Sequence, residues 1–551
     1  MGGIRFHISL ALPYYEIIFH PLIAVGLPRY CSKKSTHDVE DRMALKITLG
    51  DLLHDCAARF ADRPFITIAE TGDTTSYGEF ERLTNRLAHG MRDRFGEELD
   101  YVAVVLENSV EYLAITYALK KINAVEVSVN RAMRGAPLAR MIDQTHAPVL
   151  FTSAEHLANL DAVRTEIPHV KTLVMLDAVD EAKRLFPALE VIGFEALFSD
   201  KDDHITSPAK DTDTAAILFT SGTTGVSKGC LLSHRYAVRT AENMIGPFRV
   251  TADDCIYSPY PLSHIGAAYY DILPTMMMGG RVILRQRFSL SNFWQEVNDY
   301  GVTWFMMLGS VQQLLWANPP SELEKGHKIT RCWSTPAPVP KKDFDERFNT
   351  HLIPGGGYGS TDAGWVVVPQ WDHEGGIVLP HFEVSILDDN DDPVSAGKPG
   401  HVVVRPNEPG VMADGYFGML ERTLESRRNL WFHTGDIGRL DDEGRFYFMH
   451  RVSERIRVKG EMVSGYEVEE GALSHPAIHD CAVIAVPGEM GEEDIKAFVT
   501  LKEGQTITLD TFQAHCAERM ARFMVPKHIV ILDEMPRTPT GKPEKGKLAL
   551  M

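Results

Sequence analysis

Short apolar runs alternate with longer amphipathic segments from about Ile47 onward, and this alternation limits the fold more strongly than any other feature of the chain. Residues 49–63 and 76–96 carry apolar side chains at helical spacing, and Ser76 is a residue type that caps helix N-termini. The expected strands lie at residues 64–70, 101–108, 125–130, 148–153 and 172–176. Strands separated by helices form right-handed βαβ units, so we predict an α/β fold with mainly parallel sheets.

The sequence changes character towards the C-terminus. Residues 401–406, 439–451 and 454–464 have the composition of short strands joined by Asp-Glu-Gly and Lys-Gly turns, which is typical of antiparallel pairs. Helical and strand-like segments then alternate through the last hundred residues or so, enough for a domain of their own. We therefore expect a large N-terminal domain over residues 43–451, with a β-rich subdomain, and a small α+β C-terminal domain over residues 452–551.

Residues 1–42 differ from the rest of the chain. They are apolar, but Pro13, Glu16, His20 and Pro21 interrupt them, so no run approaches the roughly 20 apolar residues that span a bilayer. We favour an upstream extension produced by a misassigned start, because the residues from Met43 look like an ordinary beginning. A membrane-associating segment is the alternative, and we expect no stable membrane insertion.

Composition excludes several classes of protein. The chain has 551 residues, 44% of them hydrophobic and 24% charged, which is typical of soluble globular proteins with more than one domain. A net charge of −19 argues against a surface built for nucleic acid. The seven cysteines are scattered and form no C-x-x-C pair, so a disulfide framework or zinc ribbon is not expected and a reducing cytoplasm fits.

A glycine- and hydroxyl-rich loop, FTSGTTGVSKG, occupies residues 219–229, directly after an expected strand at residues 214–219. It nearly fits the nucleotide P-loop G-x-x-x-x-G-K-[ST], but Ser227 precedes Lys228 and Gly229 follows it. Successive N–H groups in such a turn can bind an anion, and the hydroxyls and the lysine suit phosphate. A surface loop rich in turn-forming residues is the alternative. The predicted phosphate-binding residues are Thr220, Ser221, Gly222, Thr223, Thr224 and Lys228.

Five further segments follow this loop in a fixed order. They are PLSHIGA with His264, GGGYGSTDAGW with Tyr358, Thr361 and Asp362, WFHTGDIG with Asp436, HRVSERIRVKGEMVSG with Arg451, and PRTPTGK with Lys542. Each segment alone has an ordinary explanation, such as a structural histidine, a turn or a solvated lysine. Together, from about residue 45 to residue 548, they resemble the superfamily of adenylate-forming enzymes, which includes acyl- and aryl-CoA synthetases, peptide-synthetase adenylation domains and firefly luciferase.

The resemblance implies an ATP site. The loop would hold the β- and γ-phosphates, with Ser227 in place of the family's proline as one departure. Tyr358 would stack on adenine, Asp436 would accept both ribose hydroxyls, and Arg451 would contact ribose or phosphate. The cofactor-binding residues implied in this way are Thr220, Ser221, Gly222, Thr223, Thr224, Lys228, Gly357, Tyr358, Gly359, Asp436, Arg451 and Gly460.

The resemblance also implies three catalytic residues and one metal ligand. Lys542 would reach the carboxylate and α-phosphate oxygens, Thr361 would bond the α-phosphate, and His264 lies where CoA ligases often have a histidine. Asp362 would hold Mg²⁺ where the family usually has glutamate; its carboxylate is still a hard oxygen ligand.

A mobile C-terminal domain is a further implication. In the family this domain turns between two half-reactions, and the hinge would be Ser453, where aspartate or lysine is usual. Gly460 would let the backbone approach the pantetheine arm of CoA, because glycine has no Cβ.

An acid-binding pocket is expected after His264. Its predicted lining residues are Tyr269, Trp304, Met306, Ser334 and Trp365. Two substrate classes stay open. One is an apolar pocket for a short or medium acyl or aryl acid. The other uses aromatic faces to hold a quaternary ammonium or sulfonium by cation–π contact, in agreement with a resemblance to the crotonobetaine/carnitine–CoA ligase branch.

We therefore predict a cytoplasmic AMP-forming acid–CoA ligase that converts a small carboxylic acid, ATP and CoA through an acyl-adenylate, with Mg²⁺ as the metal. CoA is favoured over a peptidyl carrier because Ser263-His264 replaces the aspartate of amino-acid-activating relatives and no carrier domain follows residue 551. Two alternatives remain: an adenylating enzyme with another acceptor, and a non-catalytic nucleotide- or acyl-binding homologue. A homodimer is also left open.

Overall fold

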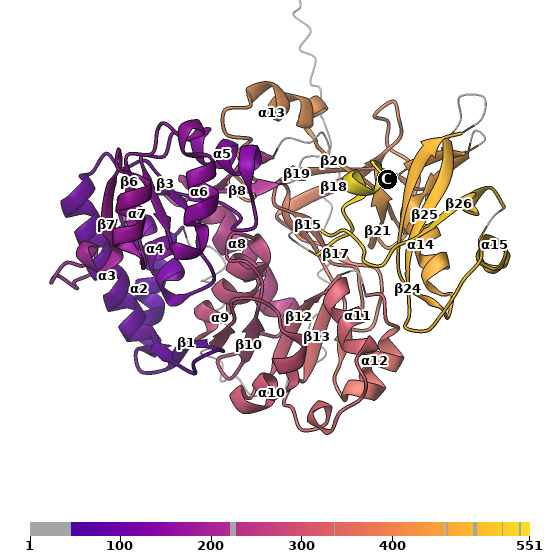
Figure 1. Cartoon of the computed structure of the whole chain (residues 1–551), viewed down its shortest axis with the longest axis horizontal. Coiled ribbons are helices and arrows are strands. Elements are labelled where there is room, and N and C mark those ends of the chain that lie inside the picture. Colours follow the sequence, from indigo (N-terminus) through magenta and orange to yellow (C-terminus); the bar gives the residue numbers. More distant parts are fainter. Residues whose placement is uncertain are drawn as a thin grey trace, which may run out of the picture. The chain divides into compact units, whose positions relative to one another are not determined.

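The computed structural model describes residues 46–551 except residues 221–226, 336, 453–454, 459–460, 489–492, 521 and 539–540 (Figure 1). Several predictions therefore fall outside the described residues. They are those for the extension at residues 1–42 and for Ser221, Gly222, Thr223, Thr224, Ser453 and Gly460.

One seven-stranded sheet has the strand order β7-β6-β5-β3-β4-β8-β9. Its strands are β3 (Tyr101–Val104), β4 (Val125–Ser128), β5 (Val149–Thr152), β6 (Thr172–Met175), β7 (Glu190–Gly193), β8 (Thr214–Thr220) and β9 (Lys228–Ser233). All neighbours are parallel except β8 and β9, which are antiparallel and bring Thr220 opposite Lys228. The two ends of the glycine-rich loop are thus held together by a strand pair.

A second seven-stranded sheet has the order β14-β13-β12-β10-β11-β1-β2. Its strands are β1 (Pro64–Ile68), β2 (Thr74–Ser76), β10 (Cys255–Ser258), β11 (Arg281–Leu284), β12 (Trp304–Leu308), β13 (Arg331–Thr335) and β14 (Leu352–Ile353). Only the β1–β2 pair is antiparallel. The prediction of mainly parallel βαβ sheets is confirmed.

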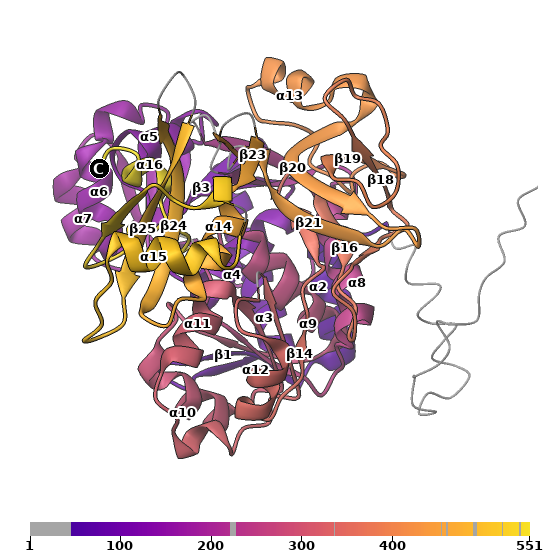
Figure 2. The same ribbon diagram turned by 90° about the vertical axis from the view of Figure 1, so that its right-hand side faces the viewer.

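Helices accompany both sheets, and α5, α6 and α7 lie beside the sheet that contains β3 in both views (Figures 1 and 2). They are α2 (Leu49–Phe60), α3 (Tyr77–Phe95), α4 (Val110–Lys121), α5 (Gly135–Asp143), α6 (Leu157–Ala162), α7 (Val179–Leu185), α8 (His234–Phe248), α9 (Leu273–Met278), α10 (Leu290–Tyr300), α11 (Gly309–Ala317), α12 (Lys341–Phe348) and α13 (Leu420–Ser426). Ser76 caps α3 as predicted, because its hydroxyl accepts the Glu79 N–H and the Glu79 carboxylate accepts the Ser76 N–H. A π-helical segment, Gly266–Ile272, precedes α9.

Two antiparallel sheets follow the parallel ones. The first contains β15 (Tyr358–Ser360), β16 (Gly364–Val368) and β17 (Ile377–Val378). The second contains β18 (Phe382–Leu387), β19 (Gly400–Pro406), β20 (Phe432–Leu440) and β21 (Phe446–Arg451). They form the predicted β-rich part of the large N-terminal domain.

The small C-terminal α+β domain has its own hydrophobic core, which includes Val468, Ala497 and Phe512. Its elements are β22 (Arg455–Val458), β23 (Glu461–Ser464), α14 (Gly465–Leu473), β24 (Ile478–Pro487), β25 (Glu493–Leu501), α15 (Leu509–Ala517), β26 (His528–Ile531) and α16 (Lys545–Leu548). The boundary at residue 451 stays a prediction. No helix among the described residues is both long and apolar enough to cross a membrane.

Candidate functional site

Tyr358 and Asp436 meet between the two antiparallel sheets. The Tyr358 hydroxyl donates a hydrogen bond of 2.6 Å to Asp436 Oδ2, and both side chains are buried. Burial raises the pKa of Tyr358, and the Asp436 charge raises it further, so the phenol stays protonated and remains the donor. The Tyr358 ring packs against Phe446 and Phe448, with ring centroids 4.8 and 6.0 Å away.

Arg451 contacts the other oxygen of the same carboxylate. Asp436 in β20 and Arg451 at the end of β21 are paired across the antiparallel ladder, and Arg451 Nε lies 3.2 Å from Asp436 Oδ1. The arginine side chain is 45% exposed, whereas that of Asp436 is 4% exposed. The structure thus brings together the three residues predicted for adenine and ribose, although they lie far apart in the sequence.

Glycines allow the β15–β16 hairpin to close around the predicted catalytic turn. A Cβ on Gly359 would lie 2.5 Å from the carbonyl oxygen of Gly364, and real Cβ atoms do not come so close to backbone. Thr361 and Asp362 occupy the turn between the two strands. The Tyr236 hydroxyl donates a hydrogen bond of 3.1 Å to the Thr361 carbonyl and so anchors the turn to α8.

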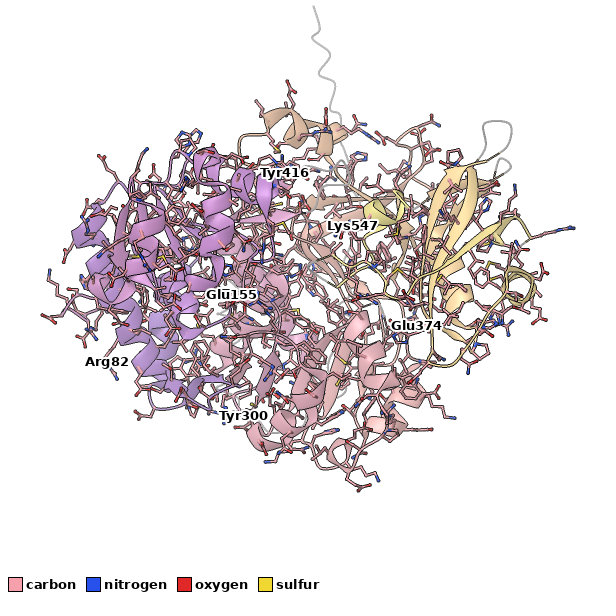
Figure 3. All side chains as sticks on the ribbon, in the orientation of Figure 1. Arg82, Glu155, Tyr300, Glu374, Tyr416 and Lys547 are labelled. Carbon is pink, nitrogen blue, oxygen red and sulfur yellow. The ribbon has the colours of Figure 1, made fainter. Side chains whose placement is uncertain are left out.

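Asp362 lies beside the two ends of the glycine-rich loop. The Cys230 thiol donates to Asp362 Oδ1 at 3.5 Å and lies 4.0 Å from the Thr220 hydroxyl. Burial raises the pKa of the Cys230 thiol, and the Asp362 charge adds to this. Lys228 Nζ lies 4.6 Å from the centre of the Tyr416 ring (Tyr416 is labelled in Figure 3). A carboxylate, a hydroxyl and an ammonium group therefore converge where the loop leaves and rejoins the sheet.

The imidazole of His264 is held in its neutral form. Desolvation lowers the pKa of the ring to about 4, and the positive charge of Lys542 acts in the same direction. Its Nδ1 accepts the Gly266 N–H at 3.0 Å, so the proton of the neutral ring is on Nε2. The Gly266–Ile272 π-helix starts at this bond.

Lys542 lies at the end of a tight turn with an exposed side chain. Its N–H donates to Thr538 Oγ1 at 3.2 Å, and its carbonyl accepts the Thr538 N–H at 2.7 Å. Gly541 has a φ of +79°, which favours glycine, and its carbonyl accepts a bond of 2.6 Å from Arg537. The turn fixes the backbone from which the Lys542 side chain extends.

The residues predicted to line the acid pocket are all buried, and they comprise three aromatic side chains, one methionine and one serine. Tyr269 packs against Tyr236 with ring centroids 6.1 Å apart. Trp304 is fully buried, and its ring stacks on Phe248. Met306 and the buried Ser334 lie further along the adjacent strands β12 and β13.

Tyr270, Trp333 and Trp365 form a three-ring group that we call the aromatic corner. The rings of Trp333 and Trp365 are 5.3 Å apart at 89°, and Tyr270 lies 4.9 Å from Trp365. A Cβ on Gly357 would meet Trp333 at 2.7 Å and Trp365 at 2.9 Å, so this glycine lets the backbone pack on both indoles.

The residue after Tyr270 is an acid buried beside the corner. Asp271 is fully buried, and burial raises the pKa of its carboxyl well above the usual value, which favours the neutral acid. The Ser258 hydroxyl donates to Asp271 Oδ2 at 2.7 Å.

Two sequence matches decide the family. Residues 53–417 match the AMP-binding enzyme family, and residues 467–542 match the AMP-binding enzyme C-terminal domain. The chain belongs to the AMP-binding enzyme family. This confirms the resemblance that the six motifs indicated.

Relatives of known activity cover most of the chain. The crotonobetaine/carnitine–CoA ligase of Proteus mirabilis (strain HI4320) is 31% identical over 487 residues, which are 86% of this chain and 92% of that protein. The oxalate–CoA ligase of Arabidopsis thaliana is 28% identical over 521 residues, which are 91% of this chain and 98% of that protein.

Solved structures share the fold. The anthranilate–CoA ligase AuaEII in complex with anthranoyl-AMP aligns with a TM-score of 0.79 and 21% identity, covering 93% of this chain and 98% of that one. ATP-bound MatB from Rhodopseudomonas palustris aligns with a TM-score of 0.78 and 22% identity, covering 91% and 98%.

Several residues of the site carried no signal in the sequence. Cys230, Tyr236 and Tyr416 contact Asp362 or the Thr361 turn, and Trp333 is one of the three rings of the aromatic corner. Their positions follow from contacts between distant segments; Cys230 and Asp362, for example, are 132 residues apart.

Proposed function

We propose that this protein is an AMP-forming acid–CoA ligase: a carboxylic acid, ATP and CoA become acyl-CoA, AMP and diphosphate through an acyl-adenylate. The observation that carries the proposal is the Asp436 carboxylate held between Tyr358 and Arg451, with Tyr358 in strand β15 directly before the turn that contains Thr361 and Asp362. Membership of the AMP-binding enzyme family and the names of relatives that match over most of the chain support it.

The ATP roles follow from the chemistry of the groups. A carboxylate accepts two hydrogen bonds from a diol, so Asp436 would bind the ribose hydroxyls, and the Tyr358 ring would lie along adenine. Thr220 and Lys228 would contact the phosphates from the two ends of the loop, because a hydroxyl and an ammonium group both donate to phosphate oxygens. Thr361 would bond the α-phosphate from its turn.

Asp362 fits a magnesium ligand by its chemistry and surroundings. Its carboxylate bonds the Tyr416 hydroxyl and accepts a long bond of 3.5 Å from the Cys230 thiol, and that sulfur lies 4.0 Å from the Thr220 hydroxyl. Hard carboxylate oxygens are the ligands that Mg²⁺ uses beside phosphates. Bound there, Mg²⁺ would neutralise charge on the triphosphate.

The first half-reaction needs positioning and charge neutralisation. The acid is already ionised at neutral pH, so no general base is required. Its carboxylate oxygen forms a bond to the α-phosphorus while the bond from that phosphorus to the β-phosphate oxygen breaks, and diphosphate leaves. Lys542 and Thr361 would stabilise the negative charge on the oxygens around the α-phosphorus, and Lys228 would stabilise the leaving diphosphate.

The second half-reaction transfers the acyl group. The CoA sulfur forms a bond to the acyl carbon, the bond from that carbon to the AMP oxygen breaks, and the thiol proton is released to solvent. We propose that Ser453 is the hinge for a domain turn between the two steps and that Gly460 lies along the pantetheine path.

We further propose that the aromatic corner selects an acid with a cationic, fully alkylated end. Indole and phenol faces attract a quaternary ammonium, and the corner gathers two indoles and a phenol at centroid distances of 5.3 and 4.9 Å. Burial raises the pKa of the neighbouring Asp271 carboxyl well above its usual value, which disfavours a competing anion there. The relatives named crotonobetaine/carnitine–CoA ligase agree with this substrate class.

A matched pair of acids tests the substrate class. We would compare 4-(trimethylammonio)but-2-enoate with the neutral 5,5-dimethylhex-2-enoate, which has the same shape, in wild type and in Trp365→Leu. A preference of about tenfold or more for the cation, lost in the variant, supports the proposal, since a desolvated cation–π contact contributes roughly 2 kcal/mol. Equal or better use of the neutral acid would instead assign an apolar acyl pocket.

A further inference from the structure

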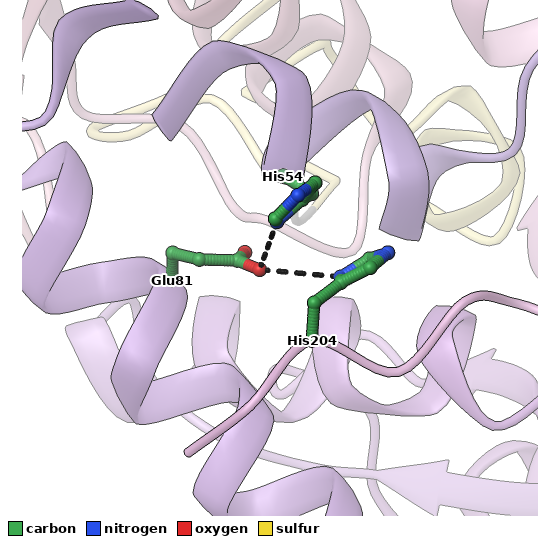
Figure 4. A group of neighbouring side chains, drawn as sticks. All are labelled: His54, Glu81 and His204. Carbon is green, nitrogen blue, oxygen red and sulfur yellow. Dashed lines mark hydrogen bonds and ion pairs between the residues drawn. The ribbon is translucent and has the colours of Figure 1, made fainter. Parts of the chain in front are cut away.

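A second cluster of ionisable side chains lies away from the nucleotide site. His54 in α2, Glu81 in α3 and His204 in the segment before β8 approach one another, and one possible ligand atom from each lies within 4.8 Å of the others (Figure 4). Among the described residues it is the one group of this kind. The proposed ligase reaction has no use for it.

Both imidazoles are directed at one oxygen. His54 Nδ1 lies 3.1 Å and His204 Nδ1 3.4 Å from Glu81 Oε1, as the dashed lines in Figure 4 show. Ligand atoms about 2.0–2.1 Å from a tetrahedral zinc ion lie about 3.3 Å apart. The His204 distance is close to the edge length of a zinc coordination tetrahedron, and the His54 ring starts at a similar distance from the same oxygen.

The Glu81 carboxylate is held by two further side chains, Lys121 and Asn85. The buried Lys121 ammonium lies 3.0 and 2.9 Å from its two oxygens, and Asn85 Nδ2 donates to Oε1 at 3.1 Å. These contacts hold the carboxylate in one orientation, with Oε1 directed to the histidines.

His204 has the support that metal-binding histidines usually have. Its Nε2 lies 3.3 Å from Asp51 Oδ1, a carboxylate behind the ring. Asn85 Nδ2 also donates to the Asp202 carbonyl at 2.9 Å, and this bond holds the segment that carries His204 against α3.

His54 leaves the site open to solvent. Its side chain is 43% exposed, and its ring stacks on that of His204 at 3.8 Å and 19°. Two nearly parallel rings cannot both direct a lone pair at one ion, so binding turns the exposed His54 ring about its Cβ–Cγ bond. A water molecule can then take the fourth position.

We propose that His54, Glu81 and His204 bind a divalent zinc-type ion that ties α2, α3 and the segment before β8 together. Two imidazoles and a carboxylate are a ligand set that suits Zn²⁺, and Co²⁺ can replace it as a spectroscopic probe. The ion is distinct from the magnesium proposed for the nucleotide site.

The chain contains a matched control. His146 and His169 also stack, with centroids 3.9 Å apart at 26°, and His169 Nδ1 lies 2.7 Å from Asp143. Unlike the first cluster, His146, His169 and Asp143 are not a group with one possible ligand atom from each within 4.8 Å of the others. His169→Ala therefore removes one ring of a stacked, carboxylate-bonded pair without touching the proposed site.

The test is zinc content of the untagged full-length protein after incubation with Zn²⁺ and gel filtration, without nucleotide. Wild type and His169→Ala should retain one zinc per chain, and the double variant His54→Ala/His204→Ala should retain none. Asp51→Asn should weaken zinc binding about tenfold or more, because it removes the carboxylate behind His204. Co²⁺ should give visible absorption bands in wild type that the double variant lacks.

Two results would overturn the proposal. One is a wild-type protein that takes up no zinc, which would leave the cluster as a hydrogen-bonded group around Glu81. The other is a double variant that retains as much zinc as wild type, which would assign the ion to other residues. Thermal unfolding of each variant without metal checks that the double variant is folded.

Discussion

The hydroxyl of Tyr358 and the carboxylate of Asp436 are joined by a hydrogen bond of 2.6 Å, although the two residues are 78 positions apart. The bond couples the orientation of the ring proposed to stack on adenine to the carboxylate proposed to bind ribose. Arg451 holds the other carboxylate oxygen. The nucleotide end of the site is therefore arranged by contacts within the protein.

Replacing Asp436 should weaken use of ATP strongly. Hydrogen bonds to a charged group contribute about 1.5–3 kcal/mol each, so Asp436→Ala, which loses two ribose contacts, should lower kcat/KM for ATP about 100-fold or more. Tyr358→Phe keeps the ring and removes only the hydroxyl, so its loss should be about tenfold or less. Steady-state kinetics with varied ATP measures both. An unchanged kcat/KM in Asp436→Ala would remove this residue from the site.

Lys542 should matter for only one half-reaction. Removing a donor that stabilises transition-state charge costs about 10²–10³ in rate, so Lys542→Ala should slow acid-dependent exchange of diphosphate into ATP by that factor. Acyl transfer from a supplied acyl-adenylate to CoA should stay close to wild type. Lys547→Ala is the control, since Lys547 is exposed and pairs with Glu544. Equal losses in both half-reactions would contradict the assignment.

The protonation of His264 should not shape the pH profile. Its pKa of about 4 lies well below neutrality, so the ring is already neutral throughout the working range. Diphosphate exchange in wild type and in His264→Asn should therefore give profiles of the same shape from about pH 5.5 to 8, whatever their heights. A break near pH 6.5 in wild type that is absent from the variant would show that the histidine titrates there.

His234 should make the N-terminal domain less stable in acid. Its side chain is buried, its Nδ1 accepts the Leu49 N–H at 3.1 Å, and burial followed by the Lys120 charge lowers its pKa to about 3. Between this value and the ordinary one of about 6.5, only the unfolded state binds the proton, so the stabilisation present above about pH 6.5 is lost as the pH falls.

Urea unfolding at two pH values measures the effect. From pH 7 to pH 5, His234 should lower the free energy of unfolding by about 2 kcal/mol, and His234→Gln should lack this part of the change. All 7 tryptophans precede residue 451, so their fluorescence reports on this domain. An identical pH dependence in wild type and variant would contradict the prediction.

Local signals in the sequence predicted local structure well. Ser76 caps α3 because its partner Glu79 is only three residues away, and the apolar runs became the buried parallel strands. Strand β9 was not predicted, because its first two residues belong to the glycine-rich motif and its pairing depends on β8. The Gly266–Ile272 π-helix has no sequence pattern of its own.

Residues of the candidate site could be predicted only where they belong to a recognisable sequence motif. Tyr358, Asp436 and Arg451 came from three motifs, and the structure brings them into contact. Trp333, Tyr236 and the His54–Glu81–His204 cluster belong to no motif. They depend on which faces of distant elements meet, and spacing along the chain does not encode this.

AMP formation is the measurement that tests the central claim most directly. Purified protein with ATP and Mg²⁺ would be given a panel of carboxylic acids, with and without CoA, beside Lys542→Ala. We predict AMP that forms with one class of acid, depends on CoA for continued turnover, and falls about 100-fold or more in the variant. ATP binding without AMP from any acid would contradict the account and favour a non-catalytic homologue, and turnover independent of CoA would mean another acyl acceptor.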